Sequence, residues 1–181
     1  MTDPQPFAVR RANPEEFQAI GQMTVSVYEQ LPGMPGVVEQ PDYYAMLMDV
    51  RTRAATPGIE ILVATGREGE LLGAVTFVGD MAAYNAGGMA FSCADASGIR
   101  LLAVRPEARK KGVGKALTRA CIDMARALGR KRVLLHTTRA MTVAWTLYEG
   151  MGFVRSPDLD FFQGRLAVFG FSLRLEMIER T

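Results

Sequence analysis

A basic turn with two glycines, Arg109-Lys-Lys-Gly-Val-Gly114, constrains the fold of this chain more than any other feature of its sequence. The apolar run 99–104 precedes the turn and predicts a β-strand. After the turn, apolar residues recur at three- and four-residue intervals from Val113 to Leu128, which predicts an amphipathic helix ending at Gly129. The sequence therefore predicts a strand, a tight turn and a helix in direct succession.

Such a turn can bind a phosphate group through its backbone. Gly112 and Gly114 let the chain bend without a Cβ atom in the way, so several N–H groups can point at one spot before the helix begins. Amides left unpaired at a helix N-terminus, together with the positive end of the helix dipole, attract phosphate or pyrophosphate. Positive side chains surround the same place, namely Arg109, Lys110, Lys111 and Lys115. The segment favours a phosphate-bearing cofactor over a plain strand-to-helix turn with solvated lysines.

The turn differs from the two common nucleotide-binding loops. A Walker loop ends in Gly-Lys followed by Ser or Thr, and neither residue follows Lys115 here. A dinucleotide fingerprint needs a third glycine where this chain has Leu117. The sequence therefore disfavours nucleotide hydrolysis and dinucleotide redox chemistry.

Length and composition narrow the class of protein. With 181 residues, 49% of them apolar, the chain can bury one core, so we expect a single domain over residues 1–181. The net charge of +2 gives no indication of a nucleic-acid partner, and no apolar run approaches the ~20 residues that span a membrane. Cys93 and Cys121 belong to no metal-binding pattern, so we expect no metal. The N-terminus lacks the layout of a secretory signal, which favours the cytoplasm.

The other segments alternate between strand and helix patterns. Strands are predicted at 7–12, 59–65, 71–78 and 132–137, and a closing hairpin around 166–177. Helices are predicted at 14–31, at 41–56 and from Val143 to either Gly150 or Gly152. The stretch 79–97 is rich in Gly, Ala and Met and has no clear period, so it is predicted to be a loop that lines a site.

Two segments resemble the motifs of the GNAT N-acetyltransferase superfamily. Leu102-Ala-Val-Arg-Pro-Glu-Ala-Arg-Lys-Lys-Gly-Val-Gly-Lys-Ala-Leu117 resembles its acetyl-CoA motif, including the Arg/Gln-x-x-Gly-x-Gly/Ala core. Ala144-Trp-Thr-Leu-Tyr-Glu-Gly-Met-Gly-Phe153 resembles its second motif. The resemblance covers about residues 99–156. It implies an α/β (α+β) fold whose central mixed, mostly antiparallel sheet is splayed between the fourth and fifth strands and flanked by helices.

The resemblance also implies acetyl-CoA as cosubstrate and assigns residues to it. The bulged fourth strand of such folds pairs with the pantetheine arm, here at Leu102, Ala103 and Val104. The amides of the turn hold the pyrophosphate, here those of Arg109, Lys110, Lys111, Gly112, Val113, Gly114 and Lys115. Tyr148 matches the family tyrosine near the coenzyme sulfur, which implies that its phenol protonates the departing thiolate; a packing role is the alternative.

The residue that takes the proton of the amine is harder to assign. Many family members carry a glutamate where this chain has Gly98, and an asparagine where it has Met141. Asp95 and an ordered water are left as candidates. His136, the single histidine, is interpreted as structural, and Cys121 lies on the apolar side of its helix, which disfavours an acetyl-cysteine route. Four aromatic residues are interpreted as core or cleft wall: Trp145, Phe161, Phe162 and Phe169.

The implied activity is direct transfer of an acetyl group to a primary amine of a small molecule, peptide or protein. A non-catalytic acyl-CoA sensor is the alternative, and transfer of a longer acyl group is left open. The implied acceptor site is built from residues 28–53, 81–95 and 158–169, which carry no readable motif. Four acids could attract a cationic amine or form a solvated face: Glu29, Glu39, Asp42 and Asp49. The apolar C-terminal strands could also pair with a second copy to form a homodimer.

Overall fold

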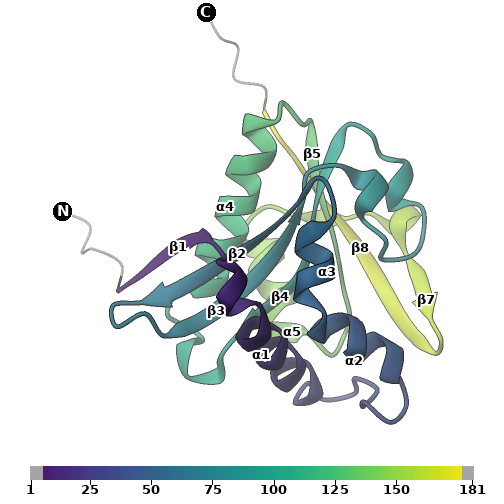
Figure 1. Ribbon diagram of the computed structural model, residues 1–181. Coiled ribbons are helices and arrows are strands. Elements are labelled where there is room, and N and C mark those ends of the chain that lie inside the picture. The colour runs from purple at the N-terminus through teal and green to yellow at the C-terminus, as the bar shows by residue number, and fades with distance from the viewer. Residues whose placement is uncertain (1–5, 177–181) are drawn as a thin grey trace, which may run out of the picture.

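The structure, a computed structural model, describes residues 6–176 and centres on one sheet (Figure 1). Within these residues eight strands pair in the order β1-β2-β3-β4-β5-β8-β6, with β7 added on β8. Every pair is antiparallel except β4 with β5, which is parallel. The strands are β1 (Phe7–Arg11), β2 (Ile59–Gly66), β3 (Leu71–Val78), β4 (Ala96–Val104), β5 (Arg132–Thr137), β6 (Val154–Arg155), β7 (Phe161–Gln163) and β8 (Leu166–Arg174).

Helices cover both faces of the sheet (Figure 1). The α-helices are α1 (Phe17–Glu29), α2 (Pro41–Met48), α3 (Val50–Ala55), α4 (Val113–Ala127) and α5 (Thr142–Gly150). Side chains of β2 alternate between the faces because successive residues of a strand point to opposite sides. Leu62 and Ala64 pack with α4 and α5, whereas Ile61 and Val63 pack with α1, α2 and α3. The predicted fold, a mixed and mostly antiparallel sheet flanked by helices, is confirmed.

The sheet opens between β4 and β5. The two strands pair from Ala96 with Arg132 to Ile99 with Leu135 and no further. At the next residues β4 bulges, since Leu101 has a φ of 55° and the β3–β4 register shifts between Ala74 and Thr76. A bulge bends and twists its strand. The carboxyl half of β4 therefore turns away from β5, and the splay lies between the fourth and fifth strands as expected.

Helix α4 begins and ends on glycines. Gly112 is its N-cap with a φ of 83°, and the amide of Ala116 donates to the Gly112 carbonyl at 2.9 Å. At the other end, Gly129 has a φ of 67°, its amide donates to Arg126, and the Arg130 amide donates to Ala125. These are the two bonds of a Schellman motif. Both predicted ends of this helix are confirmed.

Two predicted segments differ in detail. The helix predicted over 41–56 is two helices, because Asp49 leaves the helical conformation and its Oδ1 accepts a hydrogen bond from the Thr52 amide at 3.0 Å, which caps α3. The predicted loop 79–97 contains two short 3₁₀ helices, Met81–Ala83 and Ala90–Ser92. Of the closing hairpin predicted around 166–177, residues 166–174 form the single strand β8, whose hairpin partner β7 precedes it, and Met177 lies outside the described residues. Across residues 6–176, no helix has both the length and the apolar character needed to cross a membrane.

Candidate functional site

The open half of β4 leaves an edge of backbone groups facing β5 without a strand partner. Beyond Ile99 this edge includes Leu102, Ala103 and Val104. On the opposite edge of β4, Ala103 and Val104 pair with β3. Unpaired strand edges bind extended chains through main-chain hydrogen bonds. The edge suits an extended polar chain such as a pantetheine arm.

The turn before α4 presents a row of free amides. The N–H groups of residues 110–115 donate no hydrogen bond of normal geometry to any described residue. Lys110 and Gly112 both have positive φ values, 60° and 83°, so the chain curls at this point. A Cβ atom at Gly112 would meet nothing within 4 Å, so the turn is open outward. Six consecutive unpaired amides beside a helix N-terminus form a cradle that fits a pyrophosphate.

The side chains of the turn divide into exposed and buried ones. Lys110, Lys111 and Lys115 are exposed, whereas Val113 is buried against the sheet, so only its amide is available. The Nε of Arg109 donates to the Val104 carbonyl at 3.4 Å, which links the turn to the open end of β4. The residues predicted to bind the cofactor thus lie along one path, from the open strand edge to the amide cradle.

Tyr148 lies on α5, and the side chain of its neighbour Leu147 lies beside Gly114 of the turn. It is 5% exposed, and its ring stacks edge-on against Phe153 with the centroids 5.7 Å apart. Burial raises the pKa of its phenol, and the nearby Tyr84 phenol and Cys121 thiol raise it further, so the hydroxyl keeps its proton at neutral pH. It makes no hydrogen bond to another described residue, which leaves its proton available to a ligand. Burial also raises the pKa of the Cys121 thiol, so this thiol is no nucleophile.

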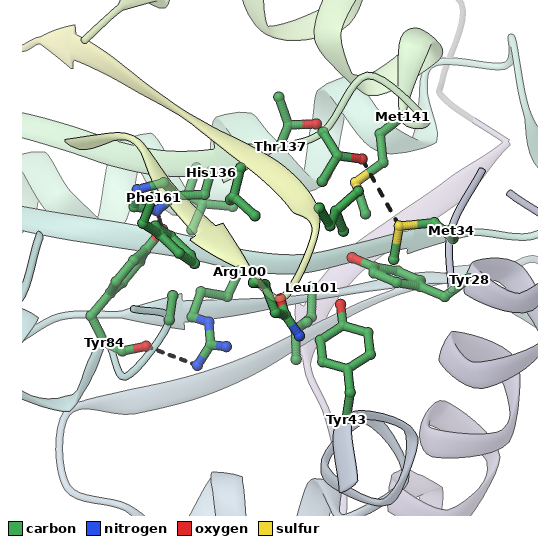
Figure 2. Close-up of a pocket in the computed structure, with 16 residues that line it drawn as sticks. Tyr28, Met34, Tyr43, Tyr84, Arg100, Leu101, His136, Thr137, Met141 and Phe161 are labelled. Atoms are coloured by element: carbon green, nitrogen blue, oxygen red, sulfur yellow. Dashed lines mark hydrogen bonds between the residues drawn. The ribbon is translucent and has the colours of Figure 1, made fainter. Parts of the chain in front are cut away.

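A second cleft lies at the splay on the side of α1 and α2 (Figure 2). Its cavity volume is about 80 Å³, and about 540 Å³ when the adjoining space open to solvent is counted. Five segments meet there: the three from which the acceptor site was predicted, together with residues 99–101 and 136–141. Its walls are formed by Tyr28, Met34, Tyr43, Tyr84, Ala86, Ile99, Arg100, Leu101, His136, Thr137, Thr138, Met141, Phe161, Gln163, Leu166 and Val168. The Oγ1 atom of Thr137 is buried beside the cleft without a hydrogen-bond partner among the described residues.

His136 is held between two partners on the wall of this cleft. Its Nε2 lies 2.8 Å from the Leu159 carbonyl, which can only accept, so Nε2 carries the proton. Burial lowers the pKa of His136, so the ring is neutral and Nδ1 accepts the hydrogen of the Tyr84 hydroxyl at 3.0 Å. The histidine joins β5 to two separate loops, which supports its predicted structural role.

Gly98 has no room for a side chain because Tyr84 fills the space. A Cβ atom at Gly98 would lie 2.4 Å from the Tyr84 ring. Asp95, the weak candidate for a base, forms an ion pair with Arg132 at 3.1 Å, at the end where β4 and β5 are still paired. Met141 lines the cleft as an apolar wall. The position of the family glutamate is therefore taken by an aromatic ring from the 79–95 loop.

Sequence reasoning missed two residues of the cleft, Tyr84 and Arg100. The Nη1 of Arg100 donates to the Tyr84 carbonyl at 2.8 Å, and its guanidinium lies over the Tyr84 ring, 5.7 Å from the centroid. A signal was present for Arg100, since a charge inside the apolar run 99–104 is unusual unless it is paired or functional. Tyr84 carried no such signal, because its loop has no periodicity. The four acids considered for attracting an amine are absent from the cleft wall. Within residues 6–176 no cluster of three metal-ligating side chains occurs.

Known proteins resemble this chain both in sequence and in fold. The family model described as "Acetyltransferase (GNAT) family" matches residues 25–153. A mycothiol acetyltransferase from Pseudarthrobacter chlorophenolicus is 41% identical over 66 residues, which are 36% of this chain and 20% of that protein. The chain thus spans about a fifth of the length of the curated relatives it matches.

Solved structures match nearly the whole fold. An acetyltransferase of the GNAT family from Staphylococcus aureus Mu50 superposes with a TM-score of 0.71 at 14% identity, covering 94% of this chain and 99% of that one. YncA from Salmonella typhimurium, solved with its cofactor acetyl-CoA, gives a TM-score of 0.64 at 19% identity and covers 96% of each chain. The splayed sheet, the amide cradle and the family match over 25–153 agree, and this chain belongs to the GNAT family of acetyltransferases.

Proposed function

We propose that this protein transfers an acetyl group from acetyl-CoA directly to a primary amine, as a single catalytic domain acting in the cytoplasm. The observation that carries the proposal is the row of six unpaired amides at residues 110–115, next to the open edge of β4. The cradle matches the pyrophosphate of coenzyme A, and the edge at Leu102, Ala103 and Val104 matches its pantetheine arm. The exposed lysines add attraction for the phosphates.

The second cleft supplies the place for the amine. Acetyl-CoA supplies the acyl group as a thioester when it is bound. Tyr148 then holds a proton beside the sulfur and donates it as the C–S bond breaks and the N–C bond forms. The amine must lose one proton, and both Asp95 and the Nδ1 of His136 already have partners. We propose that water in the cleft takes this proton, which balances the step without a basic side chain.

A sensor that binds acyl-CoA without catalysis is the second candidate. Gly98 and Met141, which replace the family glutamate and asparagine, favour it. Tyr148 favours catalysis. Coenzyme A release from acetyl-CoA in the presence of a panel of amines separates the two, because a sensor binds acetyl-CoA but releases no coenzyme A above the rate without amine. Longer acyl-CoA donors in the same assay define the accepted chain.

Replacing Gly112 by glutamate tests the amide cradle. The new carboxylate faces the pyrophosphate position and repels it, so we expect Gly112→Glu to abolish acetyl-CoA binding in calorimetry. The matched control is Gly129→Glu, since Gly129 also has a positive φ, 67°, and nothing within 4 Å of its Cβ position. This control carries the same charge and backbone strain at the other end of α4 and should bind normally. Normal binding by Gly112→Glu would refute the assignment.

A further inference from the structure

The wall of the second cleft carries one permanent charge, and it is positive. Among the 16 residues that line the cleft, Arg100 is the only lysine or arginine, and no aspartate or glutamate occurs (Figure 2). His136 is neutral because burial lowers its pKa. A site for a polycation needs carboxylates, so this wall disfavours an acceptor whose only charges are positive.

Arg100 is anchored on one side and free on the other. Figure 2 shows its guanidinium next to Tyr84, at the side of the cleft away from Tyr43. Its Nη1 donates a hydrogen bond to the Tyr84 carbonyl, whereas Nε and Nη2 have no hydrogen-bond partner among the described residues. No described carboxylate lies within ion-pair distance of it. The free Nε–Nη2 edge is the geometry that binds a planar carboxylate through two parallel hydrogen bonds.

A second arginine increases the positive potential behind the wall. Arg53 donates to the Met46 carbonyl at 2.6 Å and forms no ion pair with a described acid. Its pKa is lowered to about 10, first by burial and next by the charge of Arg100, so the two cations are close enough to repel. Asp160 pairs with Arg155, and the charge of Asp49 offsets only part of the lowering of the Arg53 pKa. An anion in the cleft would relieve this repulsion.

We infer that the acceptor amine carries a carboxylate, which Arg100 binds, and an apolar body. The inference rests on the proposed acetyl transfer. Apart from Arg100, about half of the wall is apolar, and this half can contact the side chain of an apolar amino acid: Met34, Ala86, Ile99, Leu101, Met141, Phe161, Leu166 and Val168. The other half carries five hydroxyl groups, the His136 ring and the Gln163 amide. The substrate class is therefore a free apolar amino acid or a close relative, and neither a polyamine nor a lysine side chain of a protein fits this charge pattern.

Matched acceptors test this class. Leucine, methionine and phenylalanine are compared with their carboxamides, with the corresponding decarboxylated amines and with spermidine, by coenzyme A release. We expect kcat/KM to be at least about tenfold higher for the acids, the scale of a charge-assisted hydrogen bond. The carboxamides have the more easily deprotonated amine, so basicity cannot explain a preference for the acids. Equal or faster reaction of the carboxamides or spermidine would overturn the inference while leaving acetyl transfer intact. If no amine releases coenzyme A, the proposed function fails instead.

Variants of Arg100 assign the preference to this side chain. We expect Arg100→Met to lower kcat/KM for the acids by at least about tenfold more than for the carboxamides, and Arg100→Lys to recover part of the difference. Arg67→Met, on the exposed β2–β3 turn, is the matched control. An equal loss for acids and carboxamides would mean that Arg100 only supports the fold.

Product binding gives a measurement that does not depend on turnover. N-acetylleucine and N-acetylleucinamide are titrated into the enzyme with bound coenzyme A. We expect the acid to bind at least about tenfold more tightly and Arg100→Met to remove the difference. Equal affinities for the two compounds, or binding of neither, would count against the inference even if the protein proves to be a sensor.

Discussion

At the scale of single residues, Tyr148 has the two properties that a proton donor needs. Its pKa is raised by burial, so the phenol is protonated, and its hydroxyl has no partner among the described residues. We expect Tyr148→Phe to lower kcat on the order of a hundredfold, the lower part of the range for general acids, with unchanged affinity for acetyl-CoA. Steady-state kinetics and calorimetry on the same samples provide the measurement. An unchanged kcat would mean that Tyr148 only packs against Phe153.

His136 makes the stability of the protein depend on pH. Its pKa is lowered in the folded state by burial, so below its ordinary value of 6.5 the unfolded chain takes up a proton before the folded chain does. The contribution of His136 to the free energy of unfolding should therefore be complete above pH 6.5, and the free energy of unfolding should fall as the pH drops below 6.5. Because the chain has one histidine, urea unfolding of His136→Gln should lack this decline down to about pH 5, where carboxylates begin to titrate. The same decline in both proteins would refute the assignment.

At the scale of elements, helix α4 joins the cradle to the core and is fixed at both ends by glycine. Its buried face, which includes Leu117 and Cys121, packs under β3 and β4 and holds the free amides at the mouth of the splay. The bulge at Leu101 turns the end of β4 away from β5 and so opens the sheet beside these amides. The position of the cofactor site thus depends on one helix start and one strand bulge.

The C-terminal cap of α4 should contribute measurably to stability. We expect Gly129→Ala to lower the free energy of unfolding by about 1 kcal/mol, because alanine is strained in the left-handed region where Gly129 lies. Gly150→Ala is the control, since it ends α5 without a positive φ and with nothing within 4 Å of its Cβ position. Urea unfolding curves compare the two. A similar effect of both substitutions would mean that the φ of Gly129 is unimportant.

At the scale of the whole molecule, strand β8 is an unsuitable edge for a dimer, because it already pairs with β5, β6 and β7. The outer strands remain available. Val154 on β6 and Phe162 on β7 are 61% and 75% exposed. The prediction that Phe162 belongs to the core or the cleft wall is therefore wrong. We propose that two copies associate through these strands.

Sedimentation velocity tests the proposed dimer. We expect the wild type to sediment as a dimer, and a Val154→Lys, Phe162→Lys double variant to sediment as a monomer, because charges on the contact surface oppose burial. Sedimentation of the wild type as a monomer at all concentrations would refute the proposal.

The sequence alone determined the parts of this protein that depend on local rules. The amide cradle followed from Gly112 and Gly114, and the limits of α4 from its periodicity and Gly129. The mixed, mostly antiparallel sheet, splayed between its fourth and fifth strands, followed from a family resemblance over about residues 99–156. These features were predictable because backbone conformation and side-chain periodicity act within a few residues.

Only the tertiary structure decided how the second cleft is built and charged. Arg100 faces Tyr84 and no carboxylate, His136 joins two loops, and the Tyr84 ring fills the space beside Gly98. These contacts join residues many positions apart, and a loop without periodicity supplies one partner of each. Which charge lines the cleft therefore depends on how distant segments pack around the splay, and no local pattern in the sequence encodes that packing.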